Sequence, residues 1–124
     1  MATILVIDDD AQVRRMMNRV LSQAGHEVHE AANGRLGVDA FRAHRPSIVI
    51  TDILMPEQEG IETIRALRRE GLDTRIIAVS GGGYSHNMLF LDMARQLGAD
   101  SALRKPFRAA ELLDTVNRLL DAEA

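Results

Sequence analysis

The stretch Ser47-Ile-Val-Ile-Thr-Asp-Ile-Leu-Met-Pro56 decides the fold of this chain. Its β-branched run over residues 48–50 predicts a short strand that is buried on both faces. The run stops at Asp52, and Pro56 excludes an immediate helix. The carboxylate of Asp52 is therefore expected at the carboxyl end of a buried strand, where ligands bind in open α/β sheets. The alternative is a strand-end Asp that only caps a turn.

Four other segments have strand-like patterns. Residues 3–7 and 76–79 are continuously apolar, whereas residues 26–31 and 101–104 are short and polar. Because a parallel sheet buries its central strands, the first, third and fourth strands are expected in the middle and the polar second and fifth at the edges. Right-handed crossovers then favour the strand order 2-1-3-4-5, which opens a crevice between the first and third strands.

Apolar residues at helical spacing follow each strand, which predicts an α/β fold: a doubly wound parallel sheet of five strands with five helices. Asp10 is a candidate N-cap for the first helix, and Gly25 suits the position after its end. Asn33-Gly34 predicts a turn before a short second helix. The five helices are expected over residues 11–24, 38–41, 60–69, 90–97 and 112–120.

Size and composition limit the class of protein. At 124 residues, 46% of them hydrophobic, the chain is expected to form one domain over residues 1–124. It has no Cys, so disulfides and thiolate metal sites are excluded. A net charge of −3 and 3% aromatic residues argue against a nucleic-acid partner. No apolar run approaches the roughly 20 residues of a membrane span, and no signal peptide is evident, so we expect a cytoplasmic protein without membrane contact.

Polar side chains follow four of the predicted strands and should meet at one edge of the sheet. They are the acids Asp8, Asp9 and Asp52, the hydroxyl of Ser80 and the amine of Lys105. Three carboxylates in one crevice repel one another, and Mg²⁺, which prefers oxygen ligands, would relieve that repulsion. With the metal bound, Asp52 could act as a nucleophile towards phosphorus and form an aspartyl phosphate.

The same edge offers partners for a phosphoryl group. Lys105 supplies a positive charge and Ser80 a hydroxyl, while Gly81 leaves room for close approach and the glycine-rich loop offers backbone amides. Each residue also has an ordinary alternative: the acids could cap a helix, and Lys105 could be a solvated surface lysine. These alternatives do not explain why all the polar strand ends form a complementary set on one rim.

These residues resemble the receiver domain of two-component response regulators, and the resemblance covers the whole chain. Ile4-Leu-Val-Ile-Asp-Asp-Asp10 is similar to the opening acidic motif of the family, and Thr51-Asp-Ile-Leu-Met-Pro56 to its phosphorylation motif. Ser80 falls at the family's hydroxyl position, and Lys105-Pro106-Phe107 matches its lysine motif. The resemblance implies a flavodoxin-like fold and a signalling module that is switched by phosphorylation.

The resemblance also implies residue roles. Asp52 would accept a phosphoryl group from a sensor histidine kinase or a histidine phosphotransfer protein. Asp9 and Asp52 would bind Mg²⁺ directly, with the backbone carbonyl of Leu54 as third protein ligand and Asp8 acting through water. The bond between Lys105 and the following proline is expected to be cis.

We expect a stand-alone module that is a monomer or weak homodimer and that signals by contact with a downstream protein or by phosphorelay. It would catalyse only its own phosphorylation and dephosphorylation. Ala102 departs from the family, because many members have there an aromatic residue that reports phosphorylation. The apolar run over residues 88–91 is a candidate interaction face.

Three other classes of function stay open. A degenerate receiver that serves as a scaffold is disfavoured by the complete set of acid, hydroxyl and lysine. A phosphatase of another aspartate-nucleophile family would need an acid where this chain has Leu54. A cofactor binder would need a phosphate-binding loop where it has three Asp.

The arginine clusters are expected to be solvated. They comprise Arg14-Arg15, Arg65 and Arg68-Arg69. Because the first pair lies near the predicted acidic mouth, contact with the kinase is its alternative role.

Overall fold

The structure, a computed structural model, describes residues 2–53, 59–71, 73–80, 92, 95–96 and 98–122. Five strands and four helices lie in these ranges: β1 (Thr3–Ile7), β2 (Glu27–Ala31), β3 (Ile48–Asp52), β4 (Arg75–Ser80), β5 (Ser101–Arg104), α1 (Ala11–Gln23), α2 (Gly34–His44), α3 (Glu59–Glu70) and α5 (Ala109–Ala122). The helix expected over residues 90–97 lies mostly outside the described residues, but Asp92, Arg95 and Gln96 within it are helical. The predicted interaction face at residues 88–91 lies outside them entirely.

The strands form one parallel sheet in the order β2-β1-β3-β4-β5. Every residue of β3 is buried, and β4 is buried from its second residue on. The polar strands β2 and β5 have mostly half-buried or exposed residues and form the two edges. The observed order confirms the predicted fold and strand order. The prediction was possible because the central strands of such a sheet are covered on both faces and so are apolar on both.

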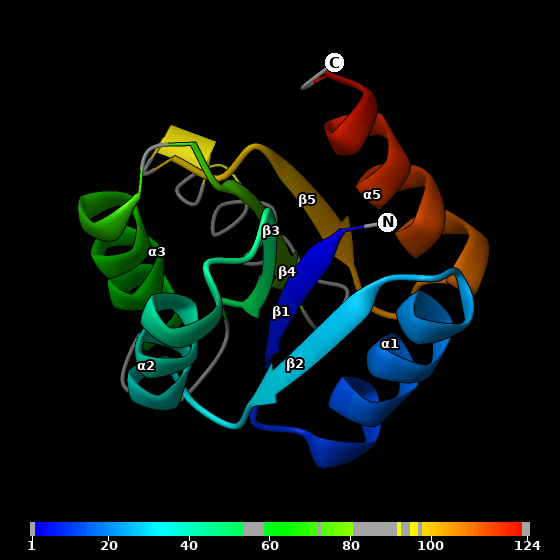
Figure 1. Cartoon of the computed structure of the whole chain (residues 1–124), viewed down its shortest axis with the longest axis horizontal. Coiled ribbons are helices and arrows are strands. Elements are labelled where there is room, and N and C mark those ends of the chain that lie inside the picture. The colour runs from blue at the N-terminus through cyan, green and yellow to red at the C-terminus, as the bar shows by residue number, and fades with distance from the viewer. Residues whose placement is uncertain are drawn as a thin grey trace.

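Helices cover both faces of the sheet, with α1 and α5 on one side and α2 and α3 on the other (Figure 1). Successive residues of a strand point to opposite faces, so neighbours in β1 serve different cores. Val6 packs in one core with Met17 of α1 and Val116 of α5. Ile7 packs in the other with Phe41 of α2 and Ile64 of α3. None of the helices in the described ranges has the length and apolar character that a membrane crossing requires.

The residues that cap α1 are as predicted, and the helix ends at Gln23, one residue before its expected end. The carboxylate of Asp10 accepts hydrogen bonds from the backbone N–H groups of Gln12 and Val13, so Asp10 is the N-cap. Gly25 follows the helix with φ of +98°, a left-handed conformation that favours glycine. The next strand begins at Glu27, one residue later than expected. His26 instead uses its ring Nδ1 to accept a hydrogen bond of 3.1 Å from the backbone N–H of Ala2.

The second helix differs from the prediction. Asn33 and Gly34 do not form a turn before a short helix, because Gly34 is already the first residue of α2. The side chain of Asn33 caps this helix by accepting a hydrogen bond of 2.8 Å from the N–H of Leu36. Asn serves both in turns and as a helix cap, so the dipeptide alone did not decide between the two structures.

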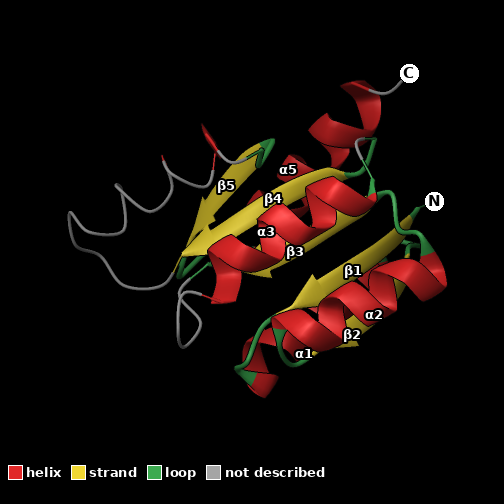
Figure 2. Ribbon diagram, turned by 90° about the vertical axis from the view of Figure 1, so that its left-hand side faces the viewer, coloured by secondary structure: helices red, strands yellow, loops and turns green. Residues whose placement is uncertain are grey.

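The carboxyl ends of the strands lie at one edge of the sheet, as the parallel arrows in Figure 2 show. Two glycines bring helices close to this edge. A Cβ on Gly37 of α2 would collide with the side chain of Ile7, and one on Gly60 of α3 would collide with the backbone of Asp52 and Ile53. The first turn of α3 is therefore packed directly on the end of β3.

Candidate functional site: an acidic cluster at the carboxyl edge of the sheet

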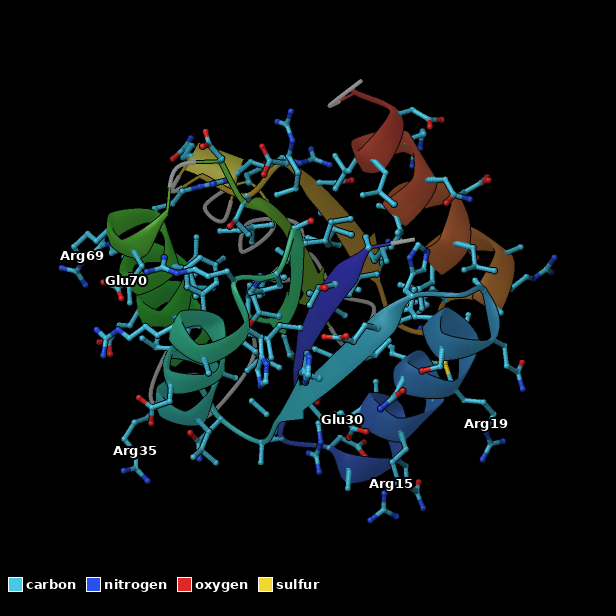
Figure 3. The ribbon with its side chains drawn as sticks, viewed as in Figure 1. Arg15, Arg19, Glu30, Arg35, Arg69 and Glu70 are labelled. Carbon is cyan, nitrogen blue, oxygen red and sulfur yellow. The ribbon has the colours of Figure 1, made fainter. Side chains whose placement is uncertain are left out.

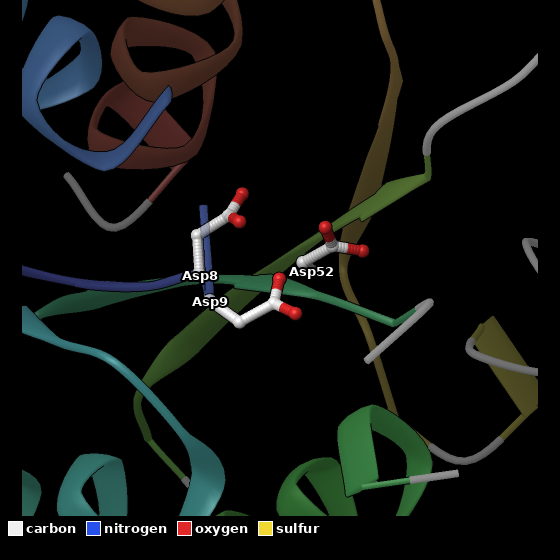
Figure 4. A group of neighbouring side chains, drawn as sticks. All are labelled: Asp8, Asp9 and Asp52. Atoms are coloured by element: carbon white, nitrogen blue, oxygen red, sulfur yellow. The ribbon is translucent and has the colours of Figure 1, made fainter. Parts of the chain in front are cut away.

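Three carboxylates gather where β1 and β3 end (Figure 4). One oxygen each from Asp8, Asp9 and Asp52 lies within 4.8 Å of the others. Asp8 directly follows β1 and is fully buried, Asp52 is the last residue of β3 and is 5% exposed, and Asp9 is exposed. The structure therefore brings together the three acids that the sequence predicted to meet, because β1 and β3 are neighbours in the sheet.

Lys105 joins two of these acids. Its Nζ donates hydrogen bonds of 2.9 Å to Oδ2 of Asp8 and 2.8 Å to Oδ2 of Asp52. The residue follows β5, and its backbone N–H donates to the carbonyl of Ser80 at 2.7 Å. The peptide bond between Lys105 and Pro106 is cis, as expected. Lys105 is the only lysine among the 15 Lys and Arg residues of the chain, and it lies at the site.

Burial and charge act against each other in this group. Burial raises the pKa of the Asp8 carboxyl above its ordinary value, and the charge of Asp52 raises it further. The backbone N–H of Asp10 and the ammonium of Lys105 oppose that rise without cancelling it. Burial lowers the pKa of Lys105, but its hydrogen bonds to Asp52 and Asp8 outweigh burial, so the pKa is raised. Lys105 is thus held as an ammonium between two carboxylates.

The remaining predicted site residues divide into two groups. Ser80 is the last residue of β4 and is fully buried, and it lies on the same edge because β4 is the neighbour of β3. The predicted roles of Leu54, as a carbonyl ligand of the metal, and of Gly81, as a phosphoryl contact, lie outside the described residues. Ala102 is half-buried and packs against the core on the side of α2 and α3.

Arg14 was expected near the acidic mouth but in solvent, and the structure instead gives it two partners at the site. Its Nη1 donates a hydrogen bond of 2.8 Å to the backbone carbonyl of Asp8, and its Nε donates one of 2.9 Å to Oε1 of Glu30 on β2. The side chain is only 16% exposed, so the prediction of a solvated arginine was wrong here. A signal was available, because Arg14 follows Val13 and lies one turn before Met17, at the border of the buried face of α1. Arg15 is exposed as predicted (Figure 3).

Arg68 is a second correction. Its guanidinium donates to the backbone carbonyls of Gly98 and Thr74 and to the carboxylate of Asp100, with donor–acceptor distances of 2.5 to 3.0 Å. It joins α3 to the segments before β4 and β5, far from the acidic cluster. Arg65 and Arg69 are exposed, as predicted.

The fold and this site define a class of protein. The model of the response regulator receiver domain matches residues 4–117. The chain therefore belongs to the receiver-domain family of response regulators, whose members are phosphorylation-switched signalling modules. Receiver domains bind Mg²⁺ at an acidic cluster, and Asp8, Asp9 and Asp52 form such a cluster here.

Individual relatives are similar over nearly the whole chain. It is 36% identical to the chemotaxis protein CheY of Bacillus subtilis, over 95% of this chain and 97% of CheY. It is 39% identical to the response regulator MprA of Mycolicibacterium vanbaalenii, over 94% of this chain but 49% of MprA. The chain thus spans almost all of one relative and about half of the other.

Solved structures give the same result. CheY4 of Vibrio cholerae aligns with a TM-score of 0.86 and 30% identity, over 96% of this chain and 98% of CheY4. NtrX of Brucella abortus aligns with a TM-score of 0.91 and 27% identity, over 98% of this chain and 27% of NtrX. The same domain thus occurs both alone and within longer proteins.

Proposed function

We propose that residues 1–124 form a single receiver domain in which Asp52 accepts a phosphoryl group from a sensor histidine kinase or a histidine phosphotransfer protein. The observation that carries this proposal is the position of the Lys105 ammonium, 2.8 Å from Asp52 and 2.9 Å from Asp8. A cation that touches the acceptor carboxylate is placed to meet the charge of an incoming phosphoryl group. An acid that merely capped a turn would need no such partner.

The residues present fit Mg²⁺. The oxygens of Asp8, Asp9 and Asp52 lie within 4.8 Å of one another, and carboxylate oxygens are the ligands that this hard cation prefers. The pKa of Asp8 is raised because burial and the charge of Asp52 disfavour its ionised form. A cation bound at the cluster would favour the ionised form and reduce the repulsion between the carboxylates. We assign Asp9, Asp52 and the backbone carbonyl of Leu54 as direct ligands, with Asp8 acting through water. Bound Mg²⁺ would offset the negative charge of the carboxylates and also that of the phosphoryl oxygens.

Phosphoryl transfer needs little covalent chemistry from the chain itself. An oxygen of Asp52 attacks phosphorus, so a P–O bond forms while the P–N bond to the donor histidine breaks and the imidazole leaves. Lys105 Nζ already donates to Oδ2 of Asp52 at 2.8 Å, and we propose that it donates to an oxygen of the phosphoryl group once that group is bound to Asp52. Ser80 and the backbone N–H of Gly81 are the proposed further donors to the phosphoryl group.

The chain is proposed to catalyse only its own phosphorylation and dephosphorylation, and to act as a monomer or weak homodimer. Its output would be contact with a downstream protein or transfer along a phosphorelay. Ala102 offers no aromatic ring at the position used by many members, so that aromatic readout is not available to this chain. The cytoplasmic location stays a prediction.

The test is phosphorylation without a kinase. The protein is incubated with Mg²⁺ and acetyl phosphate, and its intact mass is measured for wild type, Asp52→Asn and the exposed control Asp114→Asn. We expect wild type and the control to gain one phosphoryl group and Asp52→Asn to gain none. No gain in wild type would favour the scaffold function, and a gain that survives in Asp52→Asn would show that another residue is the acceptor. Beryllofluoride binding gives an independent readout with the same variants.

A further inference from the structure

Arg14 makes a bridge from the edge strand to the backbone of the acidic cluster. Its two hydrogen bonds run to Glu30 of β2 at 2.9 Å and to the carbonyl of Asp8 at 2.8 Å. Glu30 is itself anchored, because Asn18 of α1 donates to its Oε2 at 2.6 Å and accepts from the hydroxyl of Ser22 at 2.7 Å. The guanidinium is thus fixed by a chain of side chains that links α1 to β2.

The carbonyl that Arg14 contacts belongs to the peptide group between Asp8 and Asp9. The other polar groups of Asp8 are already held, since its N–H donates to the carbonyl of Ala31 and its carboxylate accepts from Asp10 and Lys105. Asp9 is different, because no hydrogen bond holds its carboxylate within the described part of the chain. The direction of this exposed acid is therefore set by its backbone, and Arg14 holds that backbone.

We infer that Arg14 is a positioning residue of the magnesium site, which aims the Asp9 carboxylate at the metal through the Asp8 carbonyl. The inference rests on the proposed Mg²⁺ site. The pairing with Glu30 explains how a cation can lie near a cation-binding cluster. The guanidinium and the Glu30 carboxylate together carry no net charge, so Arg14 can orient the loop without repelling Mg²⁺.

Charge and position predict opposite results when Arg14 is replaced. Arg14→Met removes a positive charge and leaves the Glu30 carboxylate without its cationic partner, so electrostatics alone would make Mg²⁺ bind more tightly. Loss of the hold on the Asp8 carbonyl would make Mg²⁺ bind more weakly. Groups that orient metal ligands typically change metal affinity by tenfold or more when mutated, so we expect the dissociation constant of Arg14→Met to rise about tenfold.

The experiment measures metal binding to the unphosphorylated protein. Mn²⁺ binding is followed by electron paramagnetic resonance, and Mg²⁺ affinity is obtained by competition. Arg15→Met is the matched control, since Arg15 is the next residue of α1, has the same charge and is exposed (Figure 3). It should leave the affinity unchanged. Urea unfolding of each variant without metal separates a change in the fold from a change in the site.

Unchanged or tighter binding in folded Arg14→Met would overturn the inference. Should that variant not fold, Arg14→Lys decides, because it keeps the charge but replaces the two separate donors, Nε and Nη1, by a single nitrogen on a side chain of different geometry. Weaker Mg²⁺ binding in Arg14→Lys supports a positioning role, and unchanged binding rejects it. Failure of wild type to bind Mg²⁺ or Mn²⁺ would instead reject the proposed metal site, so the two failures are distinguishable.

Discussion

Replacing Lys105 by Met tests the electrostatic account of the site most directly. The change removes two hydrogen bonds, to Asp8 at 2.9 Å and to Asp52 at 2.8 Å, and keeps most of the apolar length of the side chain. The two acids lose their shared cation while their side chains are 0% and 6% exposed. Metal-free Lys105→Met should therefore unfold more easily than wild type at neutral pH.

The size of this effect follows from the burial of the three groups. Removing one partner of a buried ion pair costs about 3 to 5 kcal/mol, because the remaining charge is left without compensation. Lys105 is 19% exposed, so water already shares its charge and the lower end of that range applies. We expect a loss of about 3 kcal/mol in the free energy of unfolding.

The loss of stability in Lys105→Met should depend on pH in a defined direction. Lys105 lowers the pKa of Asp8, so the variant should hold a proton on Asp8 up to a higher pH than wild type. The loss of stability should therefore shrink as the pH falls towards the ordinary carboxyl value of 3.8. In wild type the raised pKa of Lys105 contributes stability that is complete below 10.5 and disappears as the pH rises through the folded value.

Urea unfolding at neutral and acidic pH, with and without Mg²⁺, checks these expectations. Mg²⁺ should reduce the difference in stability between wild type and Lys105→Met, because in the variant it no longer competes with an ammonium for the carboxylates. A ligand at 100 times its Kd stabilises the folded state by about 2.7 kcal/mol. Arg104→Met, which removes the exposed cation next to Lys105, is the control and should have little effect. The reasoning would be refuted if metal-free Lys105→Met were as stable as wild type at pH 7. It would also be refuted if the difference in stability between the two proteins changed neither at acidic pH nor on addition of Mg²⁺.

Three other changes have defined outcomes. Asp8→Asn should stabilise the metal-free protein at neutral pH, because a carboxyl with a raised pKa destabilises the fold once it ionises. This gain in stability should vanish below pH 3.8, and a variant less stable than wild type in urea at neutral pH would contradict the prediction. Burial lowers the pKa of His26, so wild type should lose stability as the pH falls below 6.5, and His26→Gln should show a smaller loss in the same urea series. Gly60→Ala should cost about 3 kcal/mol in thermal unfolding and reduce phosphorylation, because its Cβ meets the backbone of Ile53; Gly37→Ala meets only a side chain and should cost less.

The arrangement of the sheet and the acids could be predicted because both follow from local patterns. Apolar runs such as residues 48–50 can only be central, and parallel strands place their carboxyl ends together. Once Asp8 and Asp52 were assigned to neighbouring strands, their meeting required no further information. Lys105 was assigned to the same edge by the same reasoning.

The roles of two arginines could not be predicted in this way. Arg14 meets Glu30 16 residues along the chain, and Arg68 meets Asp100 32 residues along it. The position of Arg14 at the border of the buried face of α1 indicates that it lies near the core, but only the packed structure shows which distant group a long guanidinium side chain meets. Asn33 was ambiguous for a related reason, because its side chain can cap a helix or shape a turn.

Because Lys105 is the single lysine of the sequence, the site can be followed selectively by spectroscopy. Since the chain has one lysine, isotope labelling of lysine alone gives one side-chain ammonium signal, from the nitrogen that bridges Asp8 and Asp52. That single resonance would report ionisation, metal binding and phosphorylation in turn, in the wild-type protein and without any reporter group.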